Sequence, residues 1–213
     1  MKYPNASDGV NKIFMSEILA LAASVVVVIC SVIAMLCFDN PDLEKLAIIM
    51  GVIIICALGL FVAGYILQIV GIVRASKDEP AFKVSVIAIV AALITTILEA
   101  VFYGNYVGSF IVEIAGDVSK FFLVHYIIHG IMHISERLER PDMIKKGNFI
   151  FRIIYIAIGF EVIVRIFELI FGKEVGEQLS MPFGVAANIL QAAEYFMFLI
   201  YVGRANNMLK NAD

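Results

Sequence analysis

The stretch Ile13–Phe38, IFMSEILALAASVVVVICSVIAMLCF, is apolar throughout except for a few small polar residues and Glu17, its one charged residue. A helix needs about 20 mostly apolar residues to cross the hydrocarbon core of a bilayer, and this stretch is long enough. It is too long for the apolar core of a cleavable signal peptide, which has roughly 7–15 residues, and no A-x-A-like site with a polar domain follows it. We therefore expect a retained membrane-spanning helix.

Five further runs of the same kind follow this first one. They lie at Leu46–Val73, Phe82–Tyr103, Val107–Ile134, Phe149–Phe171 and Met181–Gly203. Because the six runs nearly exhaust the chain, residues 1–213 are predicted to form a single transmembrane domain with no soluble domain. The predicted fold class is all-α, an integral membrane bundle of about six transmembrane helices. The even-numbered runs end alike, with an aromatic residue, a glycine and a basic exit, which indicates three helical hairpins.

Composition agrees with a membrane protein and narrows the partners. Hydrophobic residues make up 62% of the chain and charged residues 16%, against about 25% charged residues in soluble domains; the mean hydropathy is +0.94. The net charge of -3, with no basic block interleaved with aromatic residues, argues against a nucleic-acid partner. The three cysteines lie inside apolar runs, as buried apolar residues do. The expected partners are the lipid bilayer and a small polar solute, with a homodimer or larger membrane complex left open.

Lysine and arginine concentrate in two of the five connections between runs. These connections are RASKDEPAFK, residues 74–83, and SERLERPDMIKK, residues 135–146, whereas the other three are acidic or nearly uncharged. Cytoplasmic loops of membrane proteins carry the excess of basic residues. We therefore expect a multi-pass protein of the cell (plasma) membrane with both its N-terminus and its C-terminus in the cytoplasm.

Polar residues within the runs indicate where function lies, because an ionisable group at the centre of a span costs about 2.5–3.5 kcal/mol on insertion scales. They concentrate in the second half of the chain, and most fall in the predicted outer half of the bilayer, where carboxylates outnumber cations. This pattern predicts an outward-facing acidic cavity for a cationic or zwitterionic solute. The candidate ligand-binding residues are Glu99, Glu113, Asp117, Lys120, Glu161, Arg165, Glu168 and Gln191.

Three of these candidates have a second interpretation. Glu161, Arg165 and Glu168 follow the i, i+4, i+7 spacing of one helix face, so Arg165 can pair with either carboxylate. An ion-paired seam that holds helices together would show the same spacing, because charges within a membrane must be paired.

The histidines recur at intervals of four, at His125, His129 and His133. Two imidazoles one turn apart can bind the same metal ion, and Glu194, at the same predicted depth near the midplane, is the candidate third ligand for zinc or another divalent metal. The same His125, His129 and Glu194 could instead relay protons. A packed helix face, with His133 reaching water at the cytoplasmic surface, is the remaining interpretation.

The sequence therefore predicts a polytopic membrane protein that binds and transports a small cationic or zwitterionic solute, with proton coupling as one form. The alternatives are a membrane-embedded metalloenzyme with a His/His/Glu site and a non-catalytic accessory or structural subunit. Neither GxSxG nor HExxH occurs, so a non-enzymatic role is favoured, and no cofactor is expected other than that metal.

Overall fold

The computed structural model describes residues 2–37, 44–102 and 104–212. Within them the chain forms no strand and six helices: α1 (Pro4–Cys37), α2 (Glu44–Ala75), α3 (Ala81–Val101), α4 (Tyr106–Arg137), α5 (Pro141–Phe171) and α6 (Lys173–Lys210). The predicted all-α class is confirmed, and each predicted apolar run falls on one helix. Phe38 and Tyr103, at the ends of two predicted runs, lie outside the described residues.

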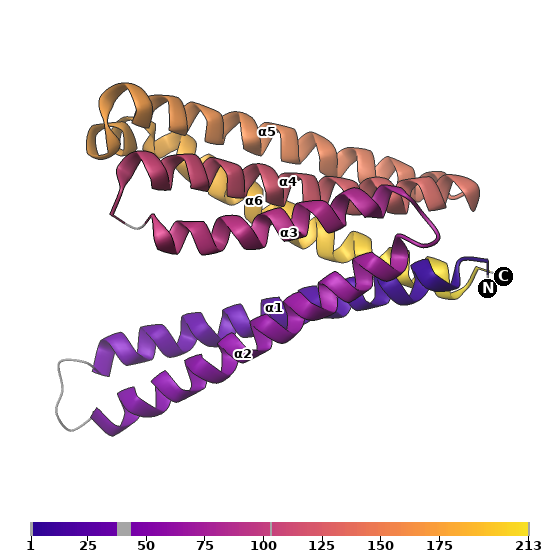
Figure 1. Ribbon diagram of the computed structural model, residues 1–213, viewed down its shortest axis with the longest axis horizontal. Helices are drawn as coiled ribbons and strands as arrows, with labels where there is room; N and C mark the ends of the chain where they lie inside the picture. Colours follow the sequence, from indigo (N-terminus) through magenta and orange to yellow (C-terminus); the bar gives the residue numbers. More distant parts are fainter. Residues whose placement is uncertain (1, 38–43, 103, 213) are drawn as a thin grey trace.

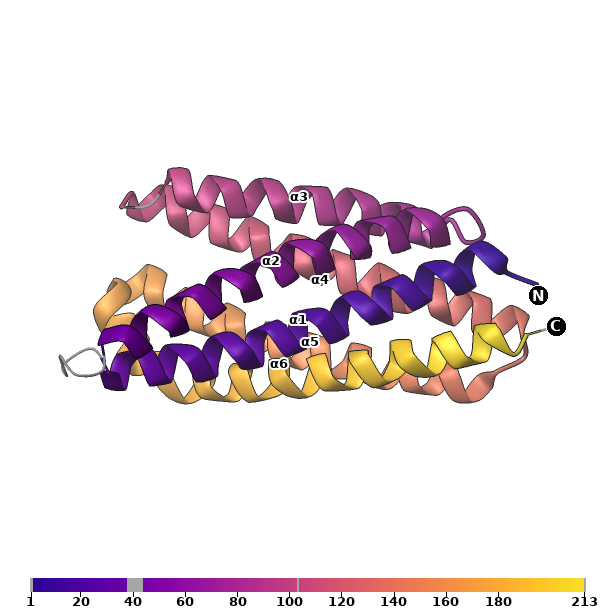
Figure 2. The ribbon, with the colours of Figure 1, turned by 90° about the horizontal axis from the view of Figure 1, so that it is seen from below.

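The helices pack as three antiparallel hairpins, α1–α2, α3–α4 and α5–α6 (Figures 1 and 2). This arrangement confirms the hairpins expected from the repeated run endings. Both termini and the α2–α3 and α4–α5 connections lie at one end of the bundle, named here the closed end. The helix ends that the other three connections join lie at the opposite end, named here the open end.

Local sequence explains where two helices begin. The side chain of Asn105 caps α4, because its Oδ1 accepts a hydrogen bond of 3.0 Å from the backbone N–H of Gly108. Pro141 begins α5, at a position where a missing backbone N–H leaves no helical hydrogen bond unmade.

The turn between α5 and α6 is shorter than the sequence indicated. Only Gly172 separates the two helices, with a φ of 77° that glycine adopts without strain. Gly176 then lies directly against α5, since a Cβ at this position would come within 2.5 Å of the Cα of Glu168. The segment 173–180, expected as a connection, is therefore the start of α6.

The densest packing lies in the closed half. Its fully buried large side chains include Ile13, Ile72, Phe82, Ile127, Ile131, Met143 and Tyr201. α1 and α2 touch at Gly9 and Gly71, where a Cβ on either glycine would lie within 2.7 Å of the other's carbonyl oxygen. Toward the open end the α1–α2 hairpin diverges from the other four helices (Figure 1).

The outer surface is suited to lipid. Large aliphatic side chains more than half exposed to the surroundings include Val28, Ile55, Ile97, Leu169 and Ile189, which come from five helices. Among the described residues, four helices are long and apolar enough to cross a membrane, at Pro4–Cys37, Lys45–Ala75, Ala81–Val101 and Gln178–Lys210. α4 and α5 have 32 and 31 residues, so they match these helices in length, but they carry most of the polar candidate residues.

Candidate functional site

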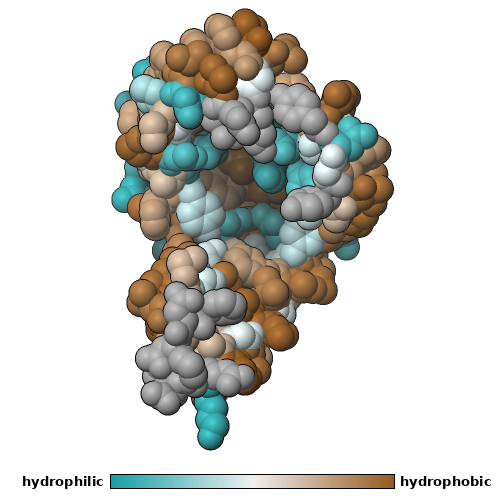
Figure 3. Space-filling view, turned by 90° about the vertical axis from the view of Figure 1, so that its left-hand side faces the viewer, coloured by the Kyte–Doolittle hydropathy of each residue, from teal (hydrophilic) through white to brown (hydrophobic). Residues whose placement is uncertain are grey.

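A cavity of about 410 Å³ lies among α4, α5 and α6. Each helix contributes four residues at spacings of one, three or four, so each presents one face to the cavity. Figure 3, which faces the open end, shows hydrophilic residues around a hollow above the α1–α2 hairpin and hydrophobic residues over the outside. The lining residues are Asp117, Lys120, Phe121 and Val124 of α4, Ile154, Ile158, Glu161 and Arg165 of α5, and Gln191, Glu194, Tyr195 and Phe198 of α6.

Arg165 is the centre of the charge network in the cavity wall. Its Nη1 lies 2.9 Å from Glu113 Oε2 and 3.3 Å from Glu168 Oε2, and its Nη2 lies 3.4 Å from Asp117 Oδ2. The pairing with Glu168 was expected from spacing along α5. The contacts with Glu113 and Asp117 join α5 to α4.

Two carboxylates of the cavity have no such partner. Gln191 Nε2 donates a hydrogen bond to Glu161 Oε1, which connects α6 to α5. Within the described ranges, neither Glu161 nor Glu194 forms an ion pair. The pairing of Arg165 with Glu161, one of the two options indicated by the sequence, is therefore not formed among the described residues.

Lys120 is the second cation of the cavity. Its Nζ lies 3.8 Å from Asp117 Oδ1, and its side chain is 67% exposed. With Glu113 and Glu168, the carboxylates around the cavity number five against the two cations Lys120 and Arg165. The formal charge of the side chains around the cavity is therefore negative.

Tyr195 also lines the cavity and was not singled out from the sequence. Its hydroxyl donates a hydrogen bond of 3.1 Å to the backbone oxygen of Glu17 in α1. The Glu17 side chain is buried and accepts a hydrogen bond of 2.8 Å from Gln68 of α2. The spacing of four between Gln191 and Tyr195 would have indicated that both share one face of α6.

Three candidate residues lie beside the cavity rather than in its lining. Glu113 and Glu168 form ion pairs with Arg165, as described above. Glu99 lies between α3 and α4, where its Oε1 is 3.3 Å from the position that a Cβ on Gly116 would occupy.

The three histidines of α4 do not line the cavity. The ring of His125 stacks on that of Phe151 at a centroid distance of 4.5 Å. The ring centroids of His129 and His133 are 4.2 Å apart. His133 Nδ1 lies 3.3 Å from Oε1 of Glu79, a buried carboxylate in the α2–α3 connection. His133, expected to reach water, thus has a buried protein partner as well as a half-exposed ring. The burial of Glu79 and its contact with His133 were not predicted from the sequence, because Glu79 lies in a basic connection between two apolar runs.

The candidate metal ligands are not brought together in one group. Among the residues whose side chains the structure describes, no three His, Cys, Asp or Glu side chains are placed to hold a metal ion. Glu194 lines the cavity, whereas His125 and His129 do not. The Nδ1 atoms of both histidines are buried without a hydrogen-bond partner.

The cavity thus gathers six of the sequence-derived candidates, Asp117, Lys120, Glu161, Arg165, Gln191 and Glu194. The six come from three helices, and their spacing along each helix is what places them on one face. Comparisons with protein-family models, with curated proteins and with solved structures found no match to this chain.

Proposed function

We propose that the chain is a multi-pass protein of the cell membrane that binds and transports a small cationic or zwitterionic solute in the cavity among α4, α5 and α6. One observation carries this proposal: Glu161 and Glu194 line the cavity and form no ion pair among the described residues. A carboxylate away from bulk water attracts a cation strongly, because the surrounding dielectric constant is low. A cationic ligand would supply the missing partner.

The rest of the lining suits an amine with an apolar part. Phe121, Tyr195 and Phe198 line the same cavity and can face a cationic group with their rings. A volume of about 410 Å³ falls in the range of small-molecule sites. Lys120 could meet the carboxylate of a zwitterion, since its side chain is mostly exposed.

The orientation in the proposal follows from charge. The basic connections and the termini lie at the closed end, which we assign to the cytoplasm. The open end, where the hollow of Figure 3 lies, then faces outward. All six helices cross the bilayer in this proposal, with α4 and α5 shielding their charges inside the bundle.

Transport rather than simple binding is proposed because the cavity lies within the apolar bundle, between two ends of opposite charge character. Proton coupling is part of the proposal, since intramembrane carboxylates are the usual proton carriers of transporters. Glu161 and Glu194 are the residues proposed for this role.

The proposal is tested by ligand-dependent thermal unfolding of the purified full chain, with choline, glycine betaine, lysine, acetate and glucose as probes. A ligand at 100 times its dissociation constant stabilises by about 2.7 kcal/mol, which raises the Tm by roughly 5–11 °C for a chain of this size. We expect such a rise with at least one cationic or zwitterionic probe. Stabilisation by acetate or glucose alone would contradict the proposal.

A matched pair of variants assigns the effect to the cavity. Glu161→Gln/Glu194→Gln removes the two unpaired charges and should abolish the rise in Tm. Glu136→Gln removes an exposed carboxylate at the closed end of α4 and should leave it unchanged. An equal loss in both variants would indicate a general effect of net charge rather than a cavity site.

A further inference from the structure

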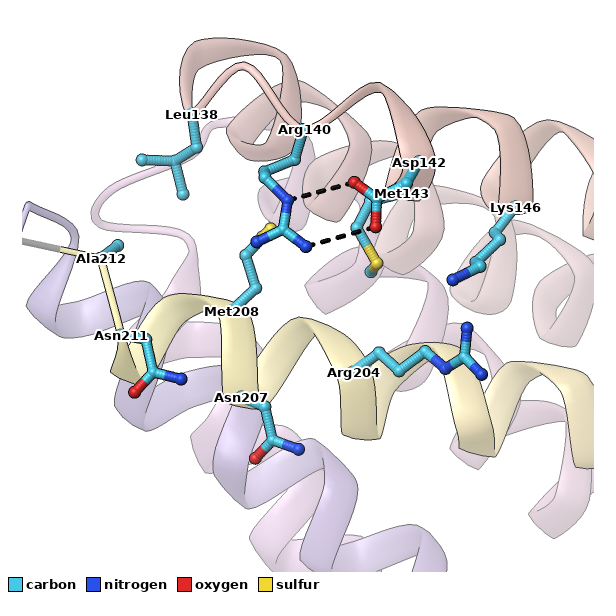
Figure 4. A pocket seen from close by; sticks show the side chains of 10 residues that line it. All are labelled: Leu138, Arg140, Asp142, Met143, Lys146, Arg204, Asn207, Met208, Asn211 and Ala212. Carbon is cyan, nitrogen blue, oxygen red and sulfur yellow. Dashed lines mark hydrogen bonds and ion pairs between the residues drawn. The ribbon is translucent and has the colours of Figure 1, made fainter.

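Basic side chains gather around a second pocket, at the closed end between α5 and α6. This pocket has a volume of about 470 Å³ and is lined by Leu138, Arg140, Asp142, Met143, Lys146, Arg204, Asn207, Met208, Asn211 and Ala212 (Figure 4). It contains three cations and one carboxylate.

The single carboxylate, that of Asp142, already forms an ion pair with Arg140. Arg140 Nε lies 3.1 Å from Asp142 Oδ1, and Arg140 Nη2 lies 3.3 Å from Asp142 Oδ2. The hydrogen bond from Arg140 holds the pKa of the Asp142 carboxyl below its usual value, so this pair stays neutral as a unit at pH 7. The remaining positive charges of the pocket are those of Lys146 and Arg204.

Lys146 of α5 and Arg204 of α6 point toward one another across the pocket (Figure 4). Within the described part of the chain, neither forms an ion pair. Two like charges that face each other repel unless an anion lies between them. A negatively charged group bound between Lys146 and Arg204 would relieve this repulsion.

An apolar groove continues from this pocket. It has a volume of about 490 Å³ and shares Asp142, Lys146 and Arg204 with the pocket. Its other lining residues are Lys145, Phe149, Ile150, Met197, Ile200 and Tyr201. From Arg204 to Met197 the groove follows α6 for about 10 Å toward the middle of the bundle, at about 1.5 Å per residue.

We propose that the pocket and groove together bind one anionic phospholipid, with the phosphate between Lys146 and Arg204 and an acyl chain along Phe149 and Ile200. The charge of the pocket and the apolar character of the groove meet at the depth where a headgroup meets its acyl chains. Anionic lipids are common in the cytoplasmic leaflet, and basic pockets between transmembrane helices on that side bind their headgroups.

Native mass spectrometry of the detergent-solubilised full chain tests this inference. The probes are phosphatidylglycerol and phosphatidylcholine with identical acyl chains, and glycerol 3-phosphate as a soluble anion. We expect phosphatidylglycerol to bind at least tenfold more tightly than phosphatidylcholine. Lys146→Gln/Arg204→Gln should weaken phosphatidylglycerol binding about 30-fold, because each basic residue near an anionic headgroup contributes a factor of about five.

Two further variants keep the test specific. Lys77→Gln/Lys83→Gln removes two exposed cations of the same end outside the pocket and should change the affinity less than threefold. Phe149→Ala should weaken both lipids alike, since it shortens the apolar groove.

Several results would overturn the inference. Equal affinity for the two lipids would do so, and so would an equal loss in the Lys77→Gln/Lys83→Gln control. Displacement of the lipid by glycerol 3-phosphate at equal concentration would assign the pocket to a free anion. A change of oligomeric state in Phe149→Ala with unchanged lipid binding would assign the groove to a second copy of the chain.

Discussion

Replacing Arg165 by leucine tests whether charge pairing holds the wall of the cavity. Arg165 contacts Glu113, Asp117 and Glu168 at 2.9–3.4 Å. Stranding a buried carboxylate costs about 3–5 kcal/mol, and Glu168, with 12% of its side chain exposed, is the most buried of the three. Glu113 and Asp117 are each 40% exposed and add little, because such pairs are screened. We therefore expect a loss of about 3 kcal/mol, at the lower end of that range.

Unfolding in detergent micelles, followed by circular dichroism, measures this loss. About 3 kcal/mol lowers the Tm by roughly 6–12 °C for a chain of this size. Arg152→Leu is the matched control on the same helix, since Arg152 is exposed and forms no ion pair among the described residues. Its free energy of unfolding should stay within about 0.5 kcal/mol of the wild-type value.

A rescue variant decides whether stranded charge is the cause. Adding Glu113→Gln, Asp117→Asn and Glu168→Gln to Arg165→Leu keeps the shapes of the side chains and removes their charges. Most of the lost stability should return, because a neutral amide needs no counter-ion. The reasoning would be refuted by a combined variant as unstable as Arg165→Leu alone, or by Arg165→Leu within 1 kcal/mol of the wild type.

Three other predictions concern topology, packing and metal. In a cysteine-free background, a cysteine at Lys77 should resist an impermeant thiol reagent in intact cells while one at Lys45 reacts; the reverse pattern would invert the proposed orientation. Gly9→Ala should destabilise the protein by about 1–3 kcal/mol, because the added Cβ would lie 2.5 Å from the Gly71 carbonyl oxygen, whereas Gly51→Ala in open space should be neutral or stabilising in the same unfolding assay. Elemental analysis should find metal well below one ion per chain in both wild type and His129→Gln; a stoichiometric metal in the wild type, lost in His129→Gln, would favour the metalloenzyme instead.

The helices could be predicted from the sequence because each apolar run is long enough to form one long helix. Their pairing was predicted from the similar endings of the even-numbered runs. The beginning of α6 could not, because hydropathy marks only the apolar part of a helix. A single glycine, Gly172, makes the α5–α6 turn, and polar residues after it continue as helix. Hydropathy alone therefore placed the start of this helix too late.

The sequence predicted which residues share a helix face in the candidate site, but it did not predict which residues of neighbouring helices contact one another. Periodicity placed Glu161 and Arg165 on one side of α5, and the cavity contains both. It did not indicate that Arg165 would pair with Glu113 of α4 or that Glu161 would accept a hydrogen bond from Gln191 of α6. Those contacts depend on how neighbouring helices are rotated about their axes. The spacing of residues within one helix carries no information about this rotation.

The most direct test of the central claim is unbiased mass spectrometry of the small molecules retained after gentle purification. Wild-type protein is compared with Glu161→Gln/Glu194→Gln, purified in parallel to the same purity. The proposed function predicts a cationic or zwitterionic compound retained by the wild type and reduced at least tenfold in the variant. A retained compound that is anionic or neutral, or one that the variant holds equally well, would contradict the claim that the two unpaired carboxylates form a solute site.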